Sequence, residues 1–178
     1  MQKLAESANP VLTFAPIRRT RRNHGLEHAT VHMMQRKVKD LKVSGWSMPF
    51  GFVLVHNAPA DVTEAAAEDA LKRMKKGDAD LAVHPNCGTN LITTGMLTTL
   101  VGLLFLRRRI TGPRLNAALF WMIVAIMMGQ PLGMKVQKHF TTDGDPGDMV
   151  IKDVFTSEIR FPSWGKKVSV TLVWTAAG

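Results

Sequence analysis

Two stretches without a single charged residue most constrain what this chain can fold into. They are residues 88–106, GTNLITTGMLTTLVGLLFL, and residues 115–134, LNAALFWMIVAIMMGQPLGM. Each is about as long as the roughly 20 residues that a helix needs to cross a bilayer. Two adjacent runs of this kind, flanked by basic clusters, are hard to bury in the soluble core of a 178-residue chain. We therefore expect a transmembrane helical hairpin, and a buried hairpin of a soluble protein is the alternative.

The sequence on either side of the hairpin predicts a small α+β domain. Before the hairpin, residue patterns predict a helix over 23–41, a strand over 49–55, a helix over 62–76 and a strand over 80–84. After the hairpin, residues 150–159 and 167–175 read as strands. The predicted fold class is thus α+β, a mixed helix and strand domain interrupted by a two-helix transmembrane hairpin.

This interpretation divides the chain into four parts. They are a basic N-terminal arm over 1–22, a helix-strand-helix-strand part over 23–87, the hairpin over 88–137, and C-terminal strands over 138–178 that complete the soluble domain. The arm contains two prolines and two arginine pairs, which predict irregular structure. Asn23 is expected to cap the helix that follows the arm.

The net charge of +9 raises the question of an acidic partner. No nucleic-acid motif is present, and basic residues beside membrane segments commonly bind anionic lipid headgroups. We therefore expect contacts with a lipid bilayer and with other membrane-protein subunits, and no specific nucleic acid. The residues expected to reach anionic lipid are Arg18, Arg19, Arg21, Arg22, Arg107, Arg108 and Arg109.

The first fifteen residues lack the basic start and long apolar run of a secretory signal. This favours the bacterial cytoplasmic (inner) membrane with the soluble domain in the cytoplasm. The arginines between the two apolar runs argue for the opposite orientation under the positive-inside rule. The arginines of the arm and the KRMKK run at residues 72–76 argue for a cytoplasmic soluble domain.

The segment NHGLEHATVH, residues 23–32, carries three histidines and a glutamate. On a helix, His24 and His28 lie one turn apart and point the same way, so that two imidazoles can bind one metal ion. Glu27 is displaced from His24 by about 60°. His-x-x-Glu-His is the reversed order of the zinc-peptidase helix motif, in which the glutamate is the base. A polar helix face packed against the rest of the protein is the alternative.

A second segment, HPNCGTN, places His84 and Cys87 three residues apart in a turn. An imidazole and a thiolate at that spacing can bind one ion. The same residues can instead simply form the turn that leads into the hairpin, with Thr89 or Asn90 as the cap of the next helix. In the metal interpretation the predicted ligands are His24, His28, His84 and Cys87. His32 and Asn90 are expected to contact these ligands without binding the metal themselves.

That ligand set suits zinc. If all four residues bind, the shell is closed and structural; if one is missing, the open position can hold water and Glu27 can accept its proton. Two functions follow. One is a zinc-binding accessory or assembly subunit of a larger bacterial membrane complex, and the other is a membrane-bound zinc-dependent hydrolase with Glu27 as catalytic general base.

The pairing of HGLEHATVH with HPNCGTN resembles a group of uncharacterised bacterial membrane proteins that includes the YqhQ family, described as predicted metal-dependent enzymes. A closer likeness, over about residues 23–154, is to a short domain-of-unknown-function family of phototrophic bacteria. The resemblance implies that His24, Glu27, His28, His84 and Cys87 are the family's polar signature, and it implies no substrate. This chain departs from the YqhQ type in having two membrane runs only.

Overall fold

The structure is a computed structural model that describes residues 1–107, 109–160 and 167–176. Within these residues the chain forms two compact units. Residues 2–84 and the chain from 138 onward form one unit, and residues 85–137 form the other. The first unit combines helices with a four-stranded sheet, and the second is a pair of apolar helices. The predicted α+β class is therefore confirmed.

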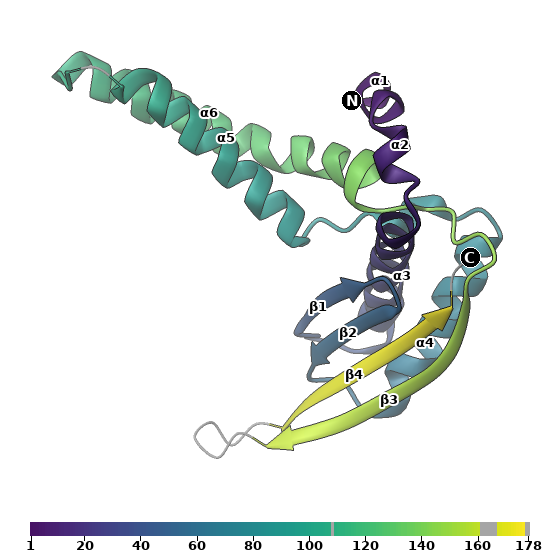
Figure 1. Cartoon of the computed structure of the whole chain (residues 1–178). Helices are drawn as coiled ribbons and strands as arrows, with labels where there is room; N and C mark the ends of the chain where they lie inside the picture. The colour runs from purple at the N-terminus through teal and green to yellow at the C-terminus, as the bar shows by residue number, and fades with distance from the viewer. Residues whose placement is uncertain (108, 161–166, 177–178) are drawn as a thin grey trace. The chain divides into compact units, whose positions relative to one another are not determined.

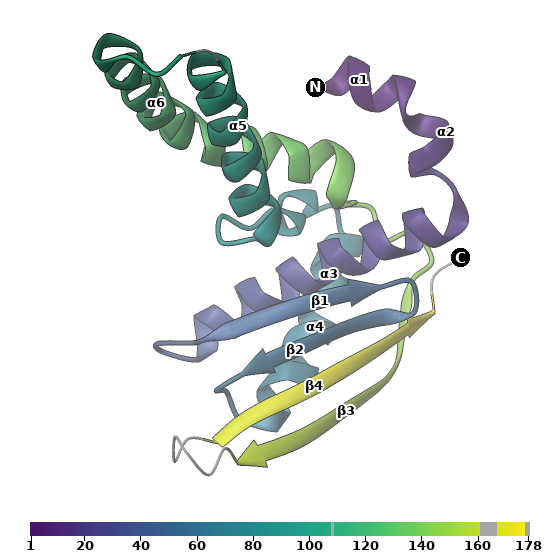
Figure 2. The ribbon, with the colours of Figure 1, turned by 60° about the vertical axis from the view of Figure 1, so that its left-hand side comes forward.

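The sheet of the first unit is fully antiparallel, with the strand order β1-β2-β4-β3. Its strands are β1 (Val43–Met48), β2 (Gly51–His56), β3 (Val150–Arg160) and β4 (Lys167–Ala176). Helices α3 (Ala15–Lys37) and α4 (Ala60–Lys75) lie on one face of this sheet, as Figure 1 and Figure 2 show. Side chains alternate between the two faces of a strand. Phe52, Leu54 and Val173 accordingly point into the fully buried core beneath the helices.

Helix α3 begins earlier than expected, so Asn23 lies inside it and does not cap it. Pro16 occupies the first turn, where a missing backbone N–H costs nothing. Asn23 is fully buried; its Nδ2 donates to the Met48 carbonyl at 2.8 Å and its Oδ1 accepts from the Thr175 hydroxyl at 2.6 Å. The arm before it also contains two short helices, α1 (Gln2–Ser7) and α2 (Asn9–Leu12), where irregular structure was predicted.

One predicted strand is absent, and one observed strand was not predicted. Residues 80–84 do not form a strand: the 3₁₀ helix η1 (Ala79–Ala82) covers most of them, and the five-residue segment DLAVH is too short for its pattern to distinguish a strand from a helical turn. Strand β1 was missed because its sequence, VSGWSM, contains a Ser-Gly pair that resembles a helix end. Pro49 and Phe50 belong to the turn between β1 and β2, since Met48 pairs directly with Gly51.

Three other elements match their predictions closely. Helix α4 (Ala60–Lys75) starts two residues before the expected start and ends one residue before the expected end. Pro59 is at its N-cap position, and Asp61 lies in its first turn. Strands β3 and β4 extend by one residue each beyond the predicted C-terminal ends. Periodicity alone was sufficient here because each segment is long and bounded by glycine or a polar turn.

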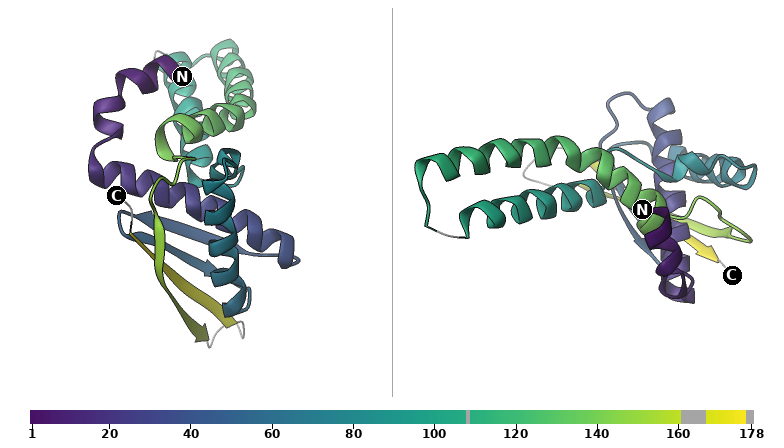
Figure 3. Two further views of the ribbon diagram at one scale, coloured as in Figure 1. Left: turned by 90° about the vertical axis from the view of Figure 1, so that its right-hand side faces the viewer. Right: turned by 90° about the horizontal axis from the view of Figure 1, so that it is seen from above.

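The second unit consists of α5 (Gly88–Leu106) and α6 (Gly112–Val136), and the chain leaves α6 through a π-helical turn, η2 (Gln137–Thr141). The two long helices run side by side (Figure 3). They pack through small residues: a side chain on Gly129 would overlap Thr94, and one on Gly133 would overlap Asn90. Close contact between small residues is typical of helix pairs in membranes.

Both helices are long and apolar enough to cross a membrane. Only 11% of the most apolar window of α5 and 22% of that of α6 are buried. A core helix of a soluble protein would be mostly buried, so the exposure of these apolar side chains argues against the soluble alternative.

His56, the last residue of β2, is buried in the α+β domain. Its Nδ1 accepts the Ala58 N–H at 3.2 Å, so the proton of the neutral ring is on Nε2, which lies 2.9 Å from the Thr171 hydroxyl and 3.0 Å from that of Thr63. Burial lowers the pKa of His56 below its ordinary value. The folded state therefore favours the neutral ring.

This lowered pKa makes stability depend on pH. Above about pH 6.5 both the folded and unfolded chains carry a neutral His56. Below that pH the unfolded chain takes up a proton that the folded chain resists, so the free energy of unfolding falls by at most about 1.4 kcal/mol per pH unit from this group. We expect the free energy of unfolding, measured with urea on the detergent-purified chain, to fall less between pH 7.5 and pH 5.5 in His56→Gln than in the parent. An equal loss in both proteins would contradict this account.

Candidate metal centre

Four histidines gather within the α+β domain. His24, His28 and His32 come from successive turns of α3, and His84 comes from the chain just after η1. The ring centres are 4.4 Å apart for His24 and His28, 5.9 Å for His28 and His84, and 4.8 Å for His32 and His84. Two imidazoles bound to one zinc ion at 2.0–2.1 Å have ring centres roughly 5 Å apart. The spacing of the rings thus fits a shared ion.

Hydrogen bonds to backbone carbonyls determine which nitrogen of each α3 ring carries the proton. His24 Nδ1 lies 2.9 Å from the Thr141 carbonyl oxygen, and His28 Nδ1 lies 2.7 Å from that of Ala82. A carbonyl oxygen only accepts, so Nδ1 must donate in both rings, and in the neutral ring the lone pair is on Nε2. Histidine ligands of metals are commonly held in this way. Ligand atoms of His24 and His28 lie within 4.8 Å of each other.

His84 and His32 extend the cluster. His32 Nε2 donates to the Val83 carbonyl at 3.0 Å, and His84 Nε2 lies 3.5 Å from the Gln35 side-chain oxygen, which is at the limit of a hydrogen bond. The pKa of His84 is lowered to about 4, first by burial and then by repulsion from His32 and His28. At neutral pH this ring is therefore neutral, and one of its two nitrogens has a lone pair that a metal ion can bind without displacing a proton.

Glu27 points toward the sheet. The Ser47 hydroxyl of β1 donates to its carboxylate, and the same carboxylate lies directly over Gly45, where any side chain would overlap it. Burial raises the pKa of Glu27, while the Ser47 hydrogen bond and the nearby His24 act in the opposite direction. The predicted catalytic base is thus a buried group that packs against β1.

Cys87 and Asn90 belong to the hairpin unit. Cys87 is the N-cap of α5, and its Sγ accepts from the Thr89 N–H at 3.4 Å; the alternative caps considered from the sequence, Thr89 and Asn90, are not used. Asn90 donates to the Pro85 carbonyl at 2.6 Å and accepts from Gln137 Nε2 at 2.6 Å. Asn90 therefore joins the two ends of the hairpin, a role that the sequence did not suggest.

Two of the arginines that were expected to reach lipid make contacts within the domain, and their binding to lipid stays a prediction. Arg21 donates to the carbonyls of Phe140 at 2.8 Å and Thr142 at 3.0 Å, and Arg22 pairs with Asp148 at 3.7 Å. Arg108 lies outside the described residues.

Backbone carbonyls are the main partners of the histidine cluster and its neighbours. Every residue has a backbone carbonyl, so the sequence does not indicate that Ala82 and Thr141 are partners of the histidines.

A family model described as a domain of unknown function (DUF6391) matches residues 19–154. The chain belongs to this family. An uncharacterized protein of Picosynechococcus sp. is 32% identical over an alignment of 87 residues, and the match covers 44% of this chain and 42% of that protein's length. No solved structure matches. The predicted domain-of-unknown-function family is therefore confirmed, and the likeness to the YqhQ proteins stays a prediction.

The contact between Glu27 and Gly45 can be tested by a double-mutant cycle. In Gly45→Ala the new methyl group overlaps the Glu27 carboxylate, and we expect a loss of about 1–3 kcal/mol in the free energy of unfolding, as is typical of overpacking. The same substitution in a Glu27→Ala background should cost less because the overlap is gone. Chemical denaturation of the four proteins measures this coupling. A Gly45→Ala cost that is equal in both backgrounds would show that Glu27 does not pack over Gly45.

Proposed function

We propose that this DUF6391 protein is a membrane-anchored, zinc-binding subunit that helps to hold or assemble a larger membrane complex. The observation that supports metal binding is the arrangement of His24 and His28. Both rings donate from Nδ1 to a backbone carbonyl, which leaves two Nε2 lone pairs one helical turn apart. Nitrogen ligands of this kind suit zinc, copper, iron and nickel, and a thiolate in the set favours zinc.

His84 and Cys87 are the proposed remaining ligands. His84 is buried beside His28, and its lowered pKa keeps the ring neutral at physiological pH. Cys87 enters the proposal from the sequence: it follows His84 by three residues, so the chain allows at most about 11 Å between their Cα atoms. Two or three neutral imidazoles and one thiolate would leave a zinc site with a charge of +1.

The position of Glu27 supports a structural role for this site. Water activation requires a carboxylate that can reach the metal-bound water. Glu27 is bound to Ser47 and packed over Gly45, which favours a shell closed by protein ligands. An accessory subunit needs a stable domain and a membrane anchor, and the proposed zinc site and hairpin would supply them.

The anchor is the α5–α6 hairpin. Its exposed apolar side chains and its small-residue helix contacts support insertion into a bilayer. We propose the bacterial cytoplasmic membrane with the α+β domain on the cytoplasmic side. Arg19, which is exposed on α3, is the residue of the arginine cluster at 18–22 that remains best placed to reach anionic headgroups.

The metal proposal predicts one bound zinc ion per chain. We expect elemental analysis of the detergent-purified protein to find about one equivalent in the parent, and much less in His28→Ala and Cys87→Ser because each removes a ligand. His56→Gln is the matched control: it changes another buried histidine of the same domain, which is bound to threonines. Parent protein that holds no metal after exposure to zinc would overturn the proposal, as would equal zinc in His28→Ala.

A zinc-dependent hydrolase is the second candidate. The observation that favours it is the raised pKa of Glu27, which lies near His24. A general base works best when its pKa is near the operating pH. Glu27→Gln separates the two. As an accessory subunit, the tagged variant should keep its zinc and still co-purify in mild detergent with the same membrane proteins as the parent. Zinc-dependent cleavage of membrane peptides or lipids by the parent, lost in Glu27→Gln, would instead establish the hydrolase.

A further inference from the structure

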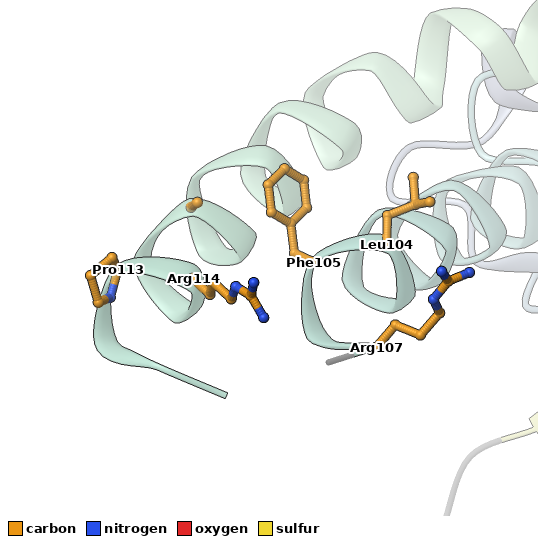
Figure 4. Close-up of a pocket in the computed structure, with 6 residues that line it drawn as sticks. Leu104, Phe105, Arg107, Pro113 and Arg114 are labelled. Carbon is orange, nitrogen blue, oxygen red and sulfur yellow. The ribbon is translucent and has the colours of Figure 1, made fainter. Parts of the chain in front are cut away.

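The connection between α5 and α6 contains a pocket of about 560 Å³. Figure 4 shows its lining, with Phe105 and Arg107 at the end of α5 and Pro113 and Arg114 at the start of α6. Four of the six lining residues are apolar and two are arginines; the six are Leu104, Phe105, Arg107, Pro113, Arg114 and Ala117. Such a pocket suits a molecule that has both a negative charge and apolar groups.

The positive charge of this pocket is not neutralised by acidic residues of the hairpin. Residues 88–134 contain no aspartate or glutamate. Arg114 Nη1 donates to the Arg109 carbonyl at 3.3 Å, a long bond that leaves most of the guanidinium's donors available for a ligand. Arg107, Arg109 and Arg114 are all exposed. Guanidinium groups bind phosphate oxygens through paired N–H donors, so the two arginines can bind a phosphate group.

The length of α5 places the pocket at a defined depth once the hairpin is inserted. The helix has 19 residues. At about 1.5 Å per residue it spans roughly 28 Å, close to the ~30 Å thickness of the hydrocarbon core. The connection between the helices then lies at the level of the lipid phosphates, with its apolar lining toward the acyl chains.

We propose that this pocket binds the phosphate of an anionic phospholipid through Arg107 and Arg114, with Leu104 and Phe105 against the glycerol and upper acyl chains. This inference rests on the proposed membrane insertion and is independent of the metal site. Soluble phosphate presents the same oxygens, but it would leave the apolar lining without a partner.

Native mass spectrometry of the full chain in detergent tests the proposal. The probes are phosphatidylglycerol, phosphatidylcholine and inorganic phosphate. We expect the parent to bind phosphatidylglycerol in preference to phosphatidylcholine. Arg107→Gln with Arg114→Gln should weaken that binding roughly 30-fold, since each arginine near an anionic surface contributes about fivefold. Lys72→Gln with Lys75→Gln, which removes the same charge from exposed positions of α4, is the control and should bind as the parent does.

Equal binding of the two lipids, an unchanged arginine double variant, or displacement of phosphatidylglycerol by inorganic phosphate at equal concentration would overturn the proposal. Carbonate washing of membranes that contain the protein distinguishes a pocket that does not bind lipid from a hairpin that does not insert into the membrane. Protein that stays in washed membranes but shows no lipid preference contradicts the pocket alone. Protein that the wash releases contradicts insertion, and the pocket proposal fails with it.

Discussion

Two hydrogen bonds from α3 to the backbone support the rest of the site: those from the Nδ1 atoms of His24 and His28 to the carbonyls of Thr141 and Ala82. Ala82 lies in the chain just before the hairpin and Thr141 just after it. The same bonds therefore attach both flanking segments to α3 and set the tautomer of each ring. The attachment of these segments and the proposed metal binding therefore depend on the same pair of contacts.

Close packing around the middle of α3 makes these contacts possible. A side chain on Gly25 would overlap the Asp143 carbonyl and crowd Ala82, so the glycine of the HGLEH motif allows the two flanking segments to approach the helix. Arg21 strengthens the same attachment: it donates to Phe140 and Thr142, and its carbonyl accepts the Asp143 N–H at 3.0 Å. On the opposite side, Gly45 leaves room for the Glu27 carboxylate. The histidines are thus fixed by contacts on both sides of the helix.

The parts of this architecture that depend on local patterns could be predicted, and the parts that depend on tertiary contacts could not. The two uncharged runs, the long strands at 150–159 and 167–175, and the one-turn spacing of His24 and His28 are properties of short segments. The approach of His84 to His28 was predicted only from the kinds of residues involved. The direction of Glu27 and the interior position of Asn23 depend on β1, a strand whose sequence looks like the end of a helix.

The tautomers of His24 and His28 test the account most directly, and they can be measured whether or not metal is bound. Two-dimensional ¹⁵N–¹H correlation spectra of histidine-labelled protein, assigned with His24→Gln and His28→Gln, distinguish a protonated Nδ1 from a protonated Nε2. The account predicts protonated Nδ1 in both rings, and a large shift of the Nε2 resonances on addition of zinc. A neutral ring in the metal-free protein with its proton on Nε2 and none on Nδ1 would contradict it, because the carbonyl of Thr141 or Ala82 would then lack its donor.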